Sequence, residues 1–405
     1  MLSIKRDILT IVCVLFAVCM LAQNNTSSPF SCYGLGDIND NVPNTYRALG
    51  GIGIGLRNNK VINPSQPASF TACDSLTFMF DLAADLLWTN YGDDAGKKNK
   101  INGNLEYITL QFPLYKRYIA FSAGVMPFSS VGYDITLADS INSDYHYTTN
   151  FYGNGGISEV YGGLSFNLFD WVALGANVYY MFGDVTISRS VSFTESEVKT
   201  VIQASETSVS SVRFREGLQF FHTFGKHSFV LGVIFENRRT LKSNYTVAES
   251  TQLDTVWVAK DIAQVPMMFG VGASYTFDNR LTVGFDYSRS YWSQTKVFES
   301  MDELRDRNRY AFGAEYRHNP IGRNYAERMF WRVGGSLADS YVGKIRRPDF
   351  MVSIGMGFPL RNAGTIFNVT FEYGHRGPAA SLEENYLRMT INASIAENWF
   401  FKRRL

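Results

Sequence analysis

Alternation of apolar and polar residues with a period of two is the feature that most constrains the fold of this chain. In LTVGFDYSRS, Leu281, Val283, Phe285 and Tyr287 share one face, while small or polar residues dominate the other. Successive side chains of a β-strand point to opposite faces of its sheet. The same alternation recurs in HSFVLGVIFE (227–236), FMVSIGMGF (350–358) and LRMTINASI (387–395). The pattern predicts an all-β protein.

The number and length of these segments favour a membrane barrel over a soluble sandwich. Most reach or exceed the roughly 9–11 residues with which a tilted strand crosses a bilayer, whereas strands of soluble proteins have about 5–6. About fourteen segments fit the pattern, an even number, as in single-chain bacterial barrels. They cover residues 75–90, 103–113, 117–137, 156–168, 171–190, 208–224, 227–240, 264–277, 280–293, 309–317, 328–339, 349–359, 365–375 and 385–397.

The connections between the segments alternate between short and long. The short ones are LYKR, FD, FGK, FDN and PLRNAG, with a longer exception at 318–327. The long ones are polar: DDAGKKNKING, ADSINSDYHYTTNFYGNGG and the tracts at 191–207, 243–263 and 291–308. Short periplasmic turns and long outer loops are typical of outer-membrane barrels. We therefore expect a transmembrane antiparallel β-barrel of about 14 strands, with both termini on the periplasmic side.

The first 22 residues have the pattern of a secretory signal peptide. Lys5 and Arg6 precede an apolar run from Ile8 to Leu21, and cleavage is expected near Ala22. A transmembrane anchor is the alternative, but the run is short for a bilayer and the polar NNTSS follows it. No later segment has about 18 uninterrupted apolar residues, so no transmembrane helix is expected.

The remaining chain is expected to divide into an N-terminal plug or hatch segment (23–73) and the β-barrel (74–405). Cys32 and Cys73 remain after cleavage of the signal peptide. In an oxidising compartment they could form a disulfide or stay two separate thiols, and both alternatives are open. At the other end, Trp399, Phe400 and Phe401 precede the basic residues 402–404 and are expected in the aromatic girdle of the membrane interface.

The glycine-rich stretch RALGGIGIGLRNNKVINPSQPASF (47–70) is the densest motif of the plug segment. It contains GxGxG rather than GxGxxG, and Pro64 and Pro67 oppose a following helix, so a nucleotide site is not expected. A barrel of this width cannot be filled by its own side chains. A compact segment with flexible glycines suits the role of a plug. Its apolar members are expected to line a greasy pocket: Leu49, Ile52, Ile54, Leu56, Val61 and Ile62.

The order of these parts resembles the FadL-type outer-membrane transporters of hydrophobic compounds. RALGGIGIGL followed by INPSQPASF is similar to the family's glycine-bearing segment and Asn-Pro-Ala element, with Gln66, Pro67 and Ala68 in the Asn-Pro-Ala position. The glutamine replaces the family's asparagine, which leaves the contacts of that side chain open. The ending ENWFFKRRL resembles members from Bacteroidetes-like bacteria. The resemblance implies a plugged fourteen-stranded barrel in the outer membrane of a Gram-negative bacterium.

The resemblance also implies passive uptake of hydrophobic compounds such as long-chain fatty acids, with a sideways exit at a kink in the third barrel strand. That strand contains Pro127, flanked by Gly124 and Gly132, within AGVMPFSSVGY. Proline lacks the N–H that a sheet ladder needs. We therefore expect interrupted pairing over residues 125–129. A local bulge without passage is the alternative.

Catalysis and metal binding have no support in the sequence. None of the five histidines stands in HxxxH or HExxH, and no serine stands in GxSxG. The near balance of 38 basic and 37 acidic residues gives no reason to expect nucleic acid. No cofactor is expected. The expected partners are outer-membrane lipids, hydrophobic small molecules or fatty acids and, for the alternative function given below, other outer-membrane proteins.

Charged residues on the polar faces of the strands have two readings. These are Glu236, Asp286, Glu372 and Arg388, together with Arg238 and Arg239 at a strand end. They could meet a fatty-acid carboxylate or hold the plug by ion pairs, and the second is favoured.

Two functions follow from the sequence. The first is an outer-membrane channel for hydrophobic compounds, which requires an apolar cavity beside the plug and a gap in the wall. The alternative is a non-transporting FadL-like barrel that serves as a subunit of a larger outer-membrane protein export or assembly complex. The alternative requires a closed wall and an exposed protein-binding face or long ordered outer segments.

Overall fold

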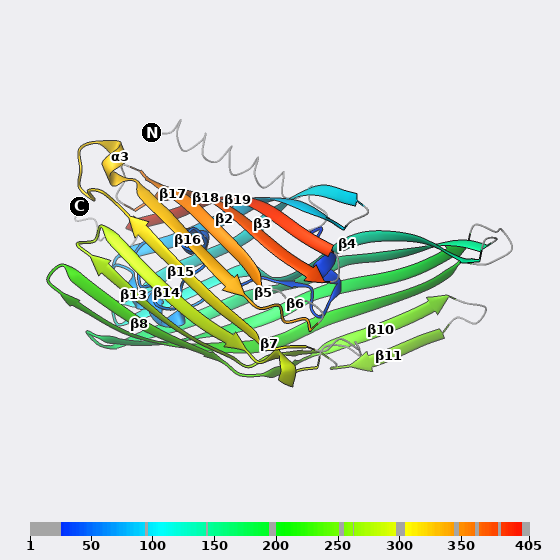
Figure 1. Cartoon of the computed structure of the whole chain (residues 1–405). Coiled ribbons are helices and arrows are strands. Elements are labelled where there is room, and N and C mark those ends of the chain that lie inside the picture. The colour runs from blue at the N-terminus through cyan, green and yellow to red at the C-terminus, as the bar shows by residue number, and fades with distance from the viewer. Residues whose placement is uncertain are drawn as a thin grey trace, which may run out of the picture.

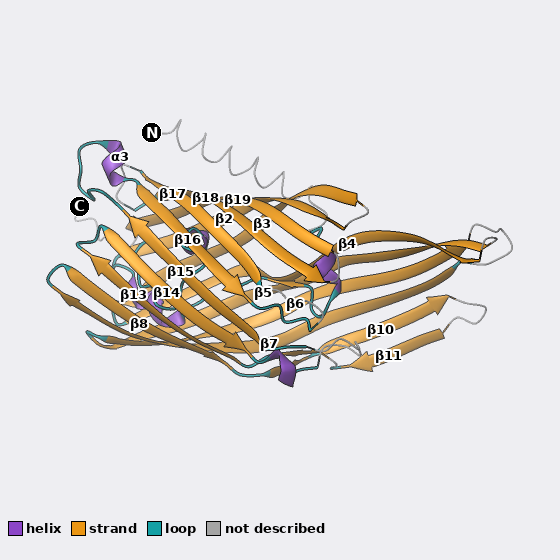
Figure 2. Ribbon diagram, in the orientation of Figure 1, coloured by secondary structure: helices purple, strands orange, loops and turns teal. Residues whose placement is uncertain are grey.

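The structure is a computed structural model that describes residues 26–93, 96–142, 145–193, 200–250, 255–261, 263–296, 304–343, 348–360, 364–379 and 382–398. The expected signal peptide and the aromatic cluster at 399–401 lie outside the described residues. Within the described ranges, β-strands dominate and helices are short (Figure 2). In this part of the chain, no helix has the length and apolar character needed to span a bilayer.

Fourteen antiparallel strands close into a barrel (Figure 1), which confirms the fold predicted from the alternation. Each strand pairs with its neighbour along the barrel, and the last strand pairs with the first, from Asn398↔Thr77 to Glu383↔Gly92. The barrel strands are β2 (Thr77–Asp93), β3 (Gly96–Tyr115), β4 (Ile119–Asn142), β5 (Tyr145–Phe169), β6 (Val172–Phe193), β7 (Val201–Phe224), β8 (His227–Glu236), β13 (Met268–Phe277), β14 (Leu281–Ser290), β15 (Arg307–Tyr316), β16 (Phe330–Ala338), β17 (Asp349–Pro359), β18 (Ile366–Ala379) and β19 (Leu382–Asn398).

Shorter elements lie before the barrel or at its ends. They are η1 (Pro29–Cys32), β1 (Asp37–Ile38), α2 (Asn44–Arg47), η2 (Pro67–Ala72), β9 (Arg239–Leu241), β10 (Ser243–Ser250), β11 (Thr255–Lys260), β12 (Ala263–Val265), η3 (Trp292–Gln294) and α3 (Tyr325–Arg328).

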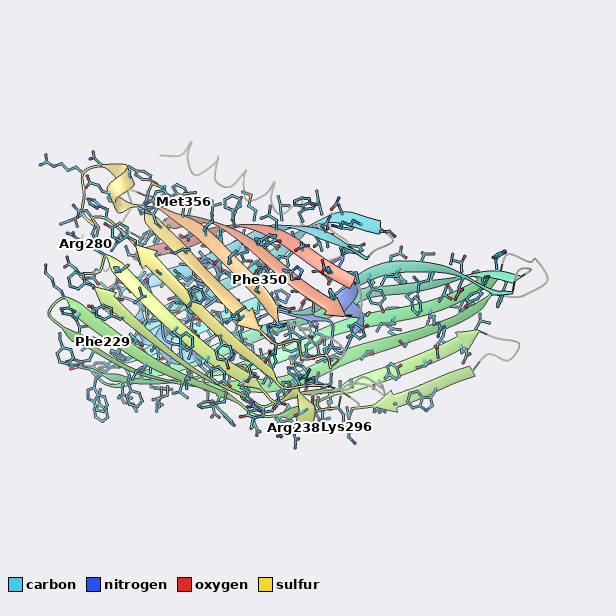
Figure 3. The ribbon with its side chains drawn as sticks, viewed as in Figure 1. Phe229, Arg238, Arg280, Lys296, Phe350 and Met356 are labelled. Carbon is cyan, nitrogen blue, oxygen red and sulfur yellow. The ribbon has the colours of Figure 1, made fainter. Side chains whose placement is uncertain are left out.

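The two faces of the barrel wall differ sharply in polarity. On β17, Val352 and Ile354 are 52% and 60% exposed, whereas the intervening Ser353 is 2% exposed. Asp286, Thr370 and Asn392 are buried in the same way on the inner face of other strands. Figure 3 shows aromatic side chains such as Phe229 around the outside of the wall. An apolar outer belt around a polar interior is the pattern of a transmembrane barrel.

Most of the polar segments predicted as outer loops form paired strands instead, whereas the described part of the tract at 291–308 contains only η3 and the start of β15. β4 and β5 continue to the pair Asn142↔Tyr145, and β6 and β7 continue to Val191↔Val201. The hairpin β10–β11 adds to the edge of β7 from Ser243↔Val209 onward. This outer sheet extends beyond the rest of the barrel at the right of Figure 1. Its strands carry polar residues on both faces, so the period of two disappears from the sequence although the backbone pairing continues.

Residues 26–73 lie in contact with the inner face of the wall. Two clusters of buried apolar side chains anchor this segment, for which we keep the name plug. One joins Ile62 and Phe70 to wall residues such as Tyr161, and the other joins Leu49 and Ile52 to Ala311. The plug begins at the outer sheet and reaches β2 at the opposite end, called here the short-turn end, where the turns at 116–118, 170–171, 225–226 and 278–280 lie.

No disulfide joins Cys32 and Cys73. Cys73 is buried in the cluster around Phe70, whereas Cys32 packs against the cluster of Val131, Tyr133 and Val185. Of the two alternatives open from the sequence, the structure has the separate thiols.

Candidate functional site in the plug, the lumen and the wall

The glycine-rich loop of the plug binds a carboxylate of the barrel wall. The backbone N–H groups of Gly53 and Ile54 donate to Asp286 Oδ2 at 2.5 and 2.7 Å, and that of Gly55 donates to Oδ1 at 3.2 Å. Successive N–H groups that converge in this way form an anion-binding nest. Asp286 is 4% exposed, so its charge depends on these donors. The loop therefore cradles an anion, and that anion is a side chain of the protein itself.

Replacing Asp286 by asparagine should weaken the seating of the plug by about 1.5–3 kcal/mol, the typical contribution of a hydrogen bond to a charged group. The substitution keeps the shape but removes the charge and turns one acceptor into a donor that faces N–H groups. Hydrogen exchange at residues 53–55 should speed up. The matched control is Asp278→Asn in an exposed turn, where exchange in the loop should not change. Equal protection in both variants would contradict the role of Asp286.

Gln66 caps the short helix η2 and contacts the barrel wall, which are the side-chain contacts that the sequence left open. Its Oε1 accepts the N–H of Ala68 at 3.3 Å, and Pro67 occupies the first turn of η2. Its Nε2 donates to the carbonyl groups of Ile54 and Val233, both at 3.2 Å. The longer side chain of glutamine thus caps the short helix and also ties the plug to β8. Through these hydrogen bonds, the Gln66-Pro67-Ala68 element attaches the plug to the barrel wall.

The apolar residues of the plug are buried. Leu49, Ile52, Ile54 and Leu56 are each 6% exposed or less. Three of them pack with Val42, Tyr46, Val61 and Ala311 in one cluster. Their role in a substrate path stays a prediction.

Buried ion pairs connect the plug to the wall. Arg47 Nη1 lies 3.3 Å from Glu106 Oε1 and 3.6 Å from Glu372 Oε2, and Arg388 Nη1 lies 3.5 Å from the same Glu372 oxygen. Arg388 Nε also lies 3.1 Å from Asp85 Oδ2. Glu372 and Arg388 therefore have the structural role favoured from the sequence. Asp286 has the same kind of role through backbone donors.

A second buried charge cluster, not anticipated from the sequence, crosses the wall strands. Arg213 donates from Nε and Nη2 to Glu159 at 2.7–3.0 Å and from Nη1 to Glu236 at 2.8 Å. Arg215 also donates to Glu236, and Asn41 of the plug donates to Glu159 at 2.6 Å. The only signal in the sequence was the charge of Glu236 on an inner face, and the position of one charge does not identify the residue with which it pairs. Arg238 and Arg239, by contrast, are exposed at the strand end.

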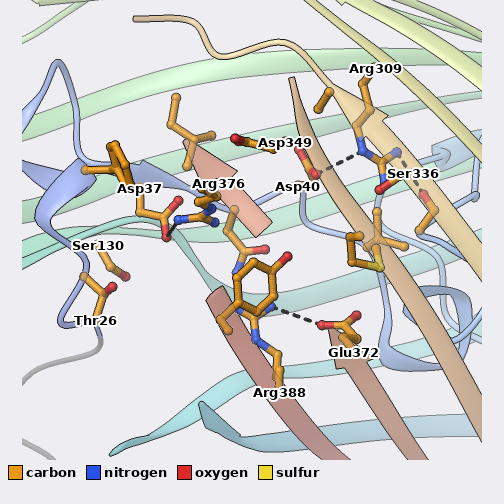
Figure 4. A pocket seen from close by; sticks show the side chains of 18 of the residues that line it. Thr26, Asp37, Asp40, Ser130, Arg309, Ser336, Asp349, Glu372, Arg376 and Arg388 are labelled. Carbon is orange, nitrogen blue, oxygen red and sulfur yellow. Dashed lines mark hydrogen bonds and ion pairs between the residues drawn. The ribbon is translucent and has the colours of Figure 1, made fainter. Parts of the chain in front are cut away.

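The lumen beyond the plug contains a cavity of about 200 Å³ with a charged lining (Figure 4). Arg376 Nη1 lies 2.8 Å from Asp37 Oδ2 across it. Asp40 lies 2.7 Å from Arg307 and 3.1 Å from Arg309. Burial raises the pKa of Asp40, but the two arginines outweigh this and hold the pKa below its usual value. The lining of this cavity thus contains paired charges, and the greasy pocket expected beside the apolar plug residues stays a prediction.

The barrel wall has a break between β3 and β4. Their pairing runs only from Tyr115↔Ile119 to Ile108↔Val125, although both strands continue. Pro127 still pairs with Ser158 of β5, and a bulge follows between Pro127 and Ser129. The ladder between β3 and β4 therefore ends within the stretch where the sequence predicted interrupted pairing. Whether a solute passes there stays a prediction.

The leading part of the plug occupies this break. Asp37 and Ile38 form β1 and pair with Ser130 and Ser129 of β4. The Asn39 N–H donates to Phe128 O at 2.9 Å. Further toward the N-terminus, Ser27 Oγ donates to Asn102 of β3 at 3.1 Å. The leading segment thus contacts both strands that border the break.

Gly132 is required by the close approach of this segment. A Cβ atom at Gly132 would collide with the carbonyl oxygen of Thr26. Ser31 Oγ also accepts the Gly132 N–H at 3.1 Å. Gly124, the other glycine near Pro127, has a comparable constraint, because a Cβ there would collide with the carbonyl oxygen of Ile108. Both glycines therefore serve close packing.

Replacing Gly132 by alanine should displace residues 26–31 from the break, because backbone atoms cannot yield as a flexible side chain can. Limited proteolysis of the purified protein should then cleave this segment at least about threefold faster, since transient opening governs cleavage. Gly162→Ala is the matched control, because nothing lies within 4 Å of a Cβ at that position. Unchanged cleavage in the Gly132 variant would mean that the segment is not held there.

Among the described residues, no group of three His, Cys, Asp or Glu side chains is placed to hold a metal ion.

Comparison with known proteins gives a sequence family and a structural class. The BamG family model matches residues 3–405. No curated protein matches the sequence. Among solved structures, a Pseudomonas aeruginosa FadL homologue has a TM-score of 0.63 at 12% identity, with 91% of this chain and 100% of that chain covered. The Ralstonia pickettii toluene transporter TbuX has a TM-score of 0.59 at 14% identity, with coverage of 88% and 98%. The Pseudomonas putida toluene transporter TodX has a TM-score of 0.57 at 14% identity, with coverage of 93% and 100%.

These matches confirm the resemblance to FadL-type transporters at the level of the fold. At 12–14% identity, they say nothing about which compound, if any, passes through this chain.

Proposed function

The chain belongs to the BamG family, and we propose that it is a closed, non-conducting barrel that serves as a subunit of a larger protein export or assembly complex in the outer membrane of a Gram-negative bacterium. The lipids of that membrane surround its apolar belt. The outer sheet of β4–β7 and β10–β11 presents the surface that binds the other proteins of the complex. The protein acts through binding and not through catalysis.

The observation that carries this proposal is that mutually paired charges lie in the lining of the lumen cavity, while the leading segment occupies the wall break. The lumen cavity is lined by the pairs of Asp37 with Arg376 and of Asp40 with Arg307. An apolar solute would gain nothing from such a lining and would have to separate charges that stabilise one another. The break between β3 and β4 holds the leading segment.

The outer sheet supports the same proposal. It is ordered well beyond the apolar belt, with aromatic contacts such as that between Tyr147 and Phe193, whose ring centroids are 5.9 Å apart. At its edge, Trp257 and Val258 on β11 are 42% and 56% exposed. Exposed aromatic and aliphatic side chains on a rigid sheet are typical of protein-binding surfaces.

Mild purification of the native protein from outer membranes tests this function. We expect it to co-purify with other membrane proteins in fixed stoichiometry. Replacing residues 245–259 by Gly-Ser-Gly should release these partners while the barrel stays folded. The control is the same replacement of residues 322–327 at the short-turn end. Purification of the intact protein alone, with a hydrophobic compound bound, would overturn the proposal.

Uptake of hydrophobic compounds such as long-chain fatty acids is the second candidate, favoured by the end of the β3–β4 ladder at Val125 beside Pro127. In this case the leading segment would have to leave the break before a solute could exit sideways. Pro127→Val should extend the ladder and reduce uptake of a radiolabelled fatty acid by outer-membrane vesicles. Unchanged uptake would remove the lateral exit.

A further inference from the structure

A second and much larger cavity opens at the short-turn end of the barrel. Its volume is about 1480 Å³, and it is separate from the charged lumen cavity on the other side of the plug. Residues 56–61, 71 and 72 of the plug form one side together with residues 74 and 75, and the turns and inner faces of the strands form the rest. The volume exceeds the roughly 300–1,000 Å³ of ordinary small-molecule sites. It suits a segment of a macromolecule better than a small ion.

The charged side chains of this cavity are predominantly basic. The lining includes Arg57, Lys60, Lys116, Arg117, Arg280, Arg317 and Arg332, against Asp74, Asp170, Asp278 and Glu315. Three of the four acidic residues already form ion pairs. Glu315 lies 2.6 Å from Arg332, Asp278 lies 3.4 Å from Arg280, and Asp74 lies 4.0 Å from Arg117. In the described part of the chain, no ion pair reaches Lys60 or Arg317.

Lys60 and Arg317 form the least compensated pair of charges. Burial and then the charge of Arg317 lower the pKa of Lys60, against the opposing effect of Asp74. The Arg317 guanidinium lies 4.7 Å from the centre of the Phe330 ring, and Nη2 makes a long 3.4 Å hydrogen bond to Asn279 O. Its Nε is buried and has no hydrogen-bond partner within the described residues. Within the described residues, these two like charges face the cavity without a carboxylate in ion-pair contact with either of them.

We propose that this cavity binds an acidic polypeptide segment of a partner protein at the short-turn side of the membrane. Carboxylates of aspartate or glutamate would match the planar donors of Arg317 and the ammonium group of Lys60. Apolar floor residues Leu49, Leu56 and Phe330 would contact the intervening side chains. A bilayer surface fits less well, because the site is recessed inside the barrel opening and a flat membrane does not enter it.

Peptide binding to the purified full-length protein in detergent tests the proposal. The probe is a fluorescein-labelled ten-residue peptide of alternating glutamate and serine, and its lysine–serine analogue serves as the negative probe. We expect saturable binding of the acidic peptide that weakens as salt rises, because exposed charges are screened. The double variant Lys60→Gln/Arg317→Gln should bind about tenfold more weakly, as expected for the loss of charge-assisted hydrogen bonds.

The control variant is Lys97→Gln/Lys98→Gln/Lys100→Gln, which removes exposed charges from β3 at the opposite end of the barrel. It should bind the peptide as the native protein does. Heat-modifiable migration on gels verifies that every variant is folded. The proposal is overturned if the native protein does not bind the peptide, or if both variants weaken binding equally. It is also overturned if equimolar pyrophosphate or phosphatidylglycerol micelles displace the peptide, since the site would then be a phosphate or lipid site.

This proposal is independent of the proposed function. A barrel that co-purifies with partners but does not bind the acidic peptide would retain the function and lose this site. The reverse outcome would retain the site and remove the role of the outer sheet.

Discussion

Replacement of Arg213 by methionine is expected to lower the free energy of unfolding by about 3–5 kcal/mol, the cost of leaving a buried charge without its partner. Arg213 holds Glu159 through three hydrogen bonds and also binds Glu236. Glu159 is fully buried, so water cannot replace the lost donors. Asn41 of the plug would then be its remaining partner. The variant should therefore loosen both the wall and the plug.

Urea unfolding of the refolded barrel in detergent, followed by heat-modifiable migration on gels, measures this effect. Arg280→Met is the matched control, because its pair with Asp278 lies in an exposed turn at 3.4 Å and should contribute less than about 1 kcal/mol. A double replacement of Arg213 and Glu159 by methionine should recover part of the stability. An Arg213 variant that unfolds at the same urea concentration as the Arg280 variant would refute the assignment.

Deletion of residues 26–73 is expected to convert the closed barrel into an open pore. Eight strands enclose about as much space as inward side chains can fill, and wider barrels leave a channel. The inner faces of this wall carry small and polar residues such as Ser353 and Thr370, which leave the centre of the lumen to the plug. Ion conductance in planar bilayers should rise by roughly tenfold or more, because the lumen would fill with water.

The barrel without its plug should still insert, because its apolar belt belongs to residues outside the deletion. The Asp286→Asn variant is the informative comparison, since it loosens the glycine-rich loop but keeps the plug. It should conduct only in brief openings. If the deletion variant folds and inserts but remains electrically silent, another part of the chain closes the lumen.

The lumen cavity of this barrel has charged pairs in its lining. The solved neighbours include transporters of toluene. In this chain, the space beside the plug holds ion pairs, and the charges of Asp40 and Glu372 are compensated by arginines from both the plug and the wall. Under the function proposed above, this fold serves a binding role and not a transport role, since a fold does not fix a function.

The sequence by itself determined the barrel, because a period of two over about fourteen segments of membrane-spanning length has few other solutions. It also determined the positions of the short turns and the placement of a compact glycine-rich segment before the first strand. It placed Pro127 at the end of the β3–β4 ladder, where the missing N–H acts locally. These features depend on residues that are close together in the sequence, so they can be predicted from the local sequence pattern.

Only the tertiary structure decided what the plug touches. The nest of Gly53–Gly55 needs Asp286, more than 200 residues away, and Arg213 needs Glu159 from a different strand. It also decided that the polar outer segments are strands and that the leading segment occupies the wall break. Such contacts depend on the register of the strands and on the closure of the barrel, because these bring inner faces together that are distant in the sequence. The position of a charged residue on an inner face does not identify the residue with which it pairs.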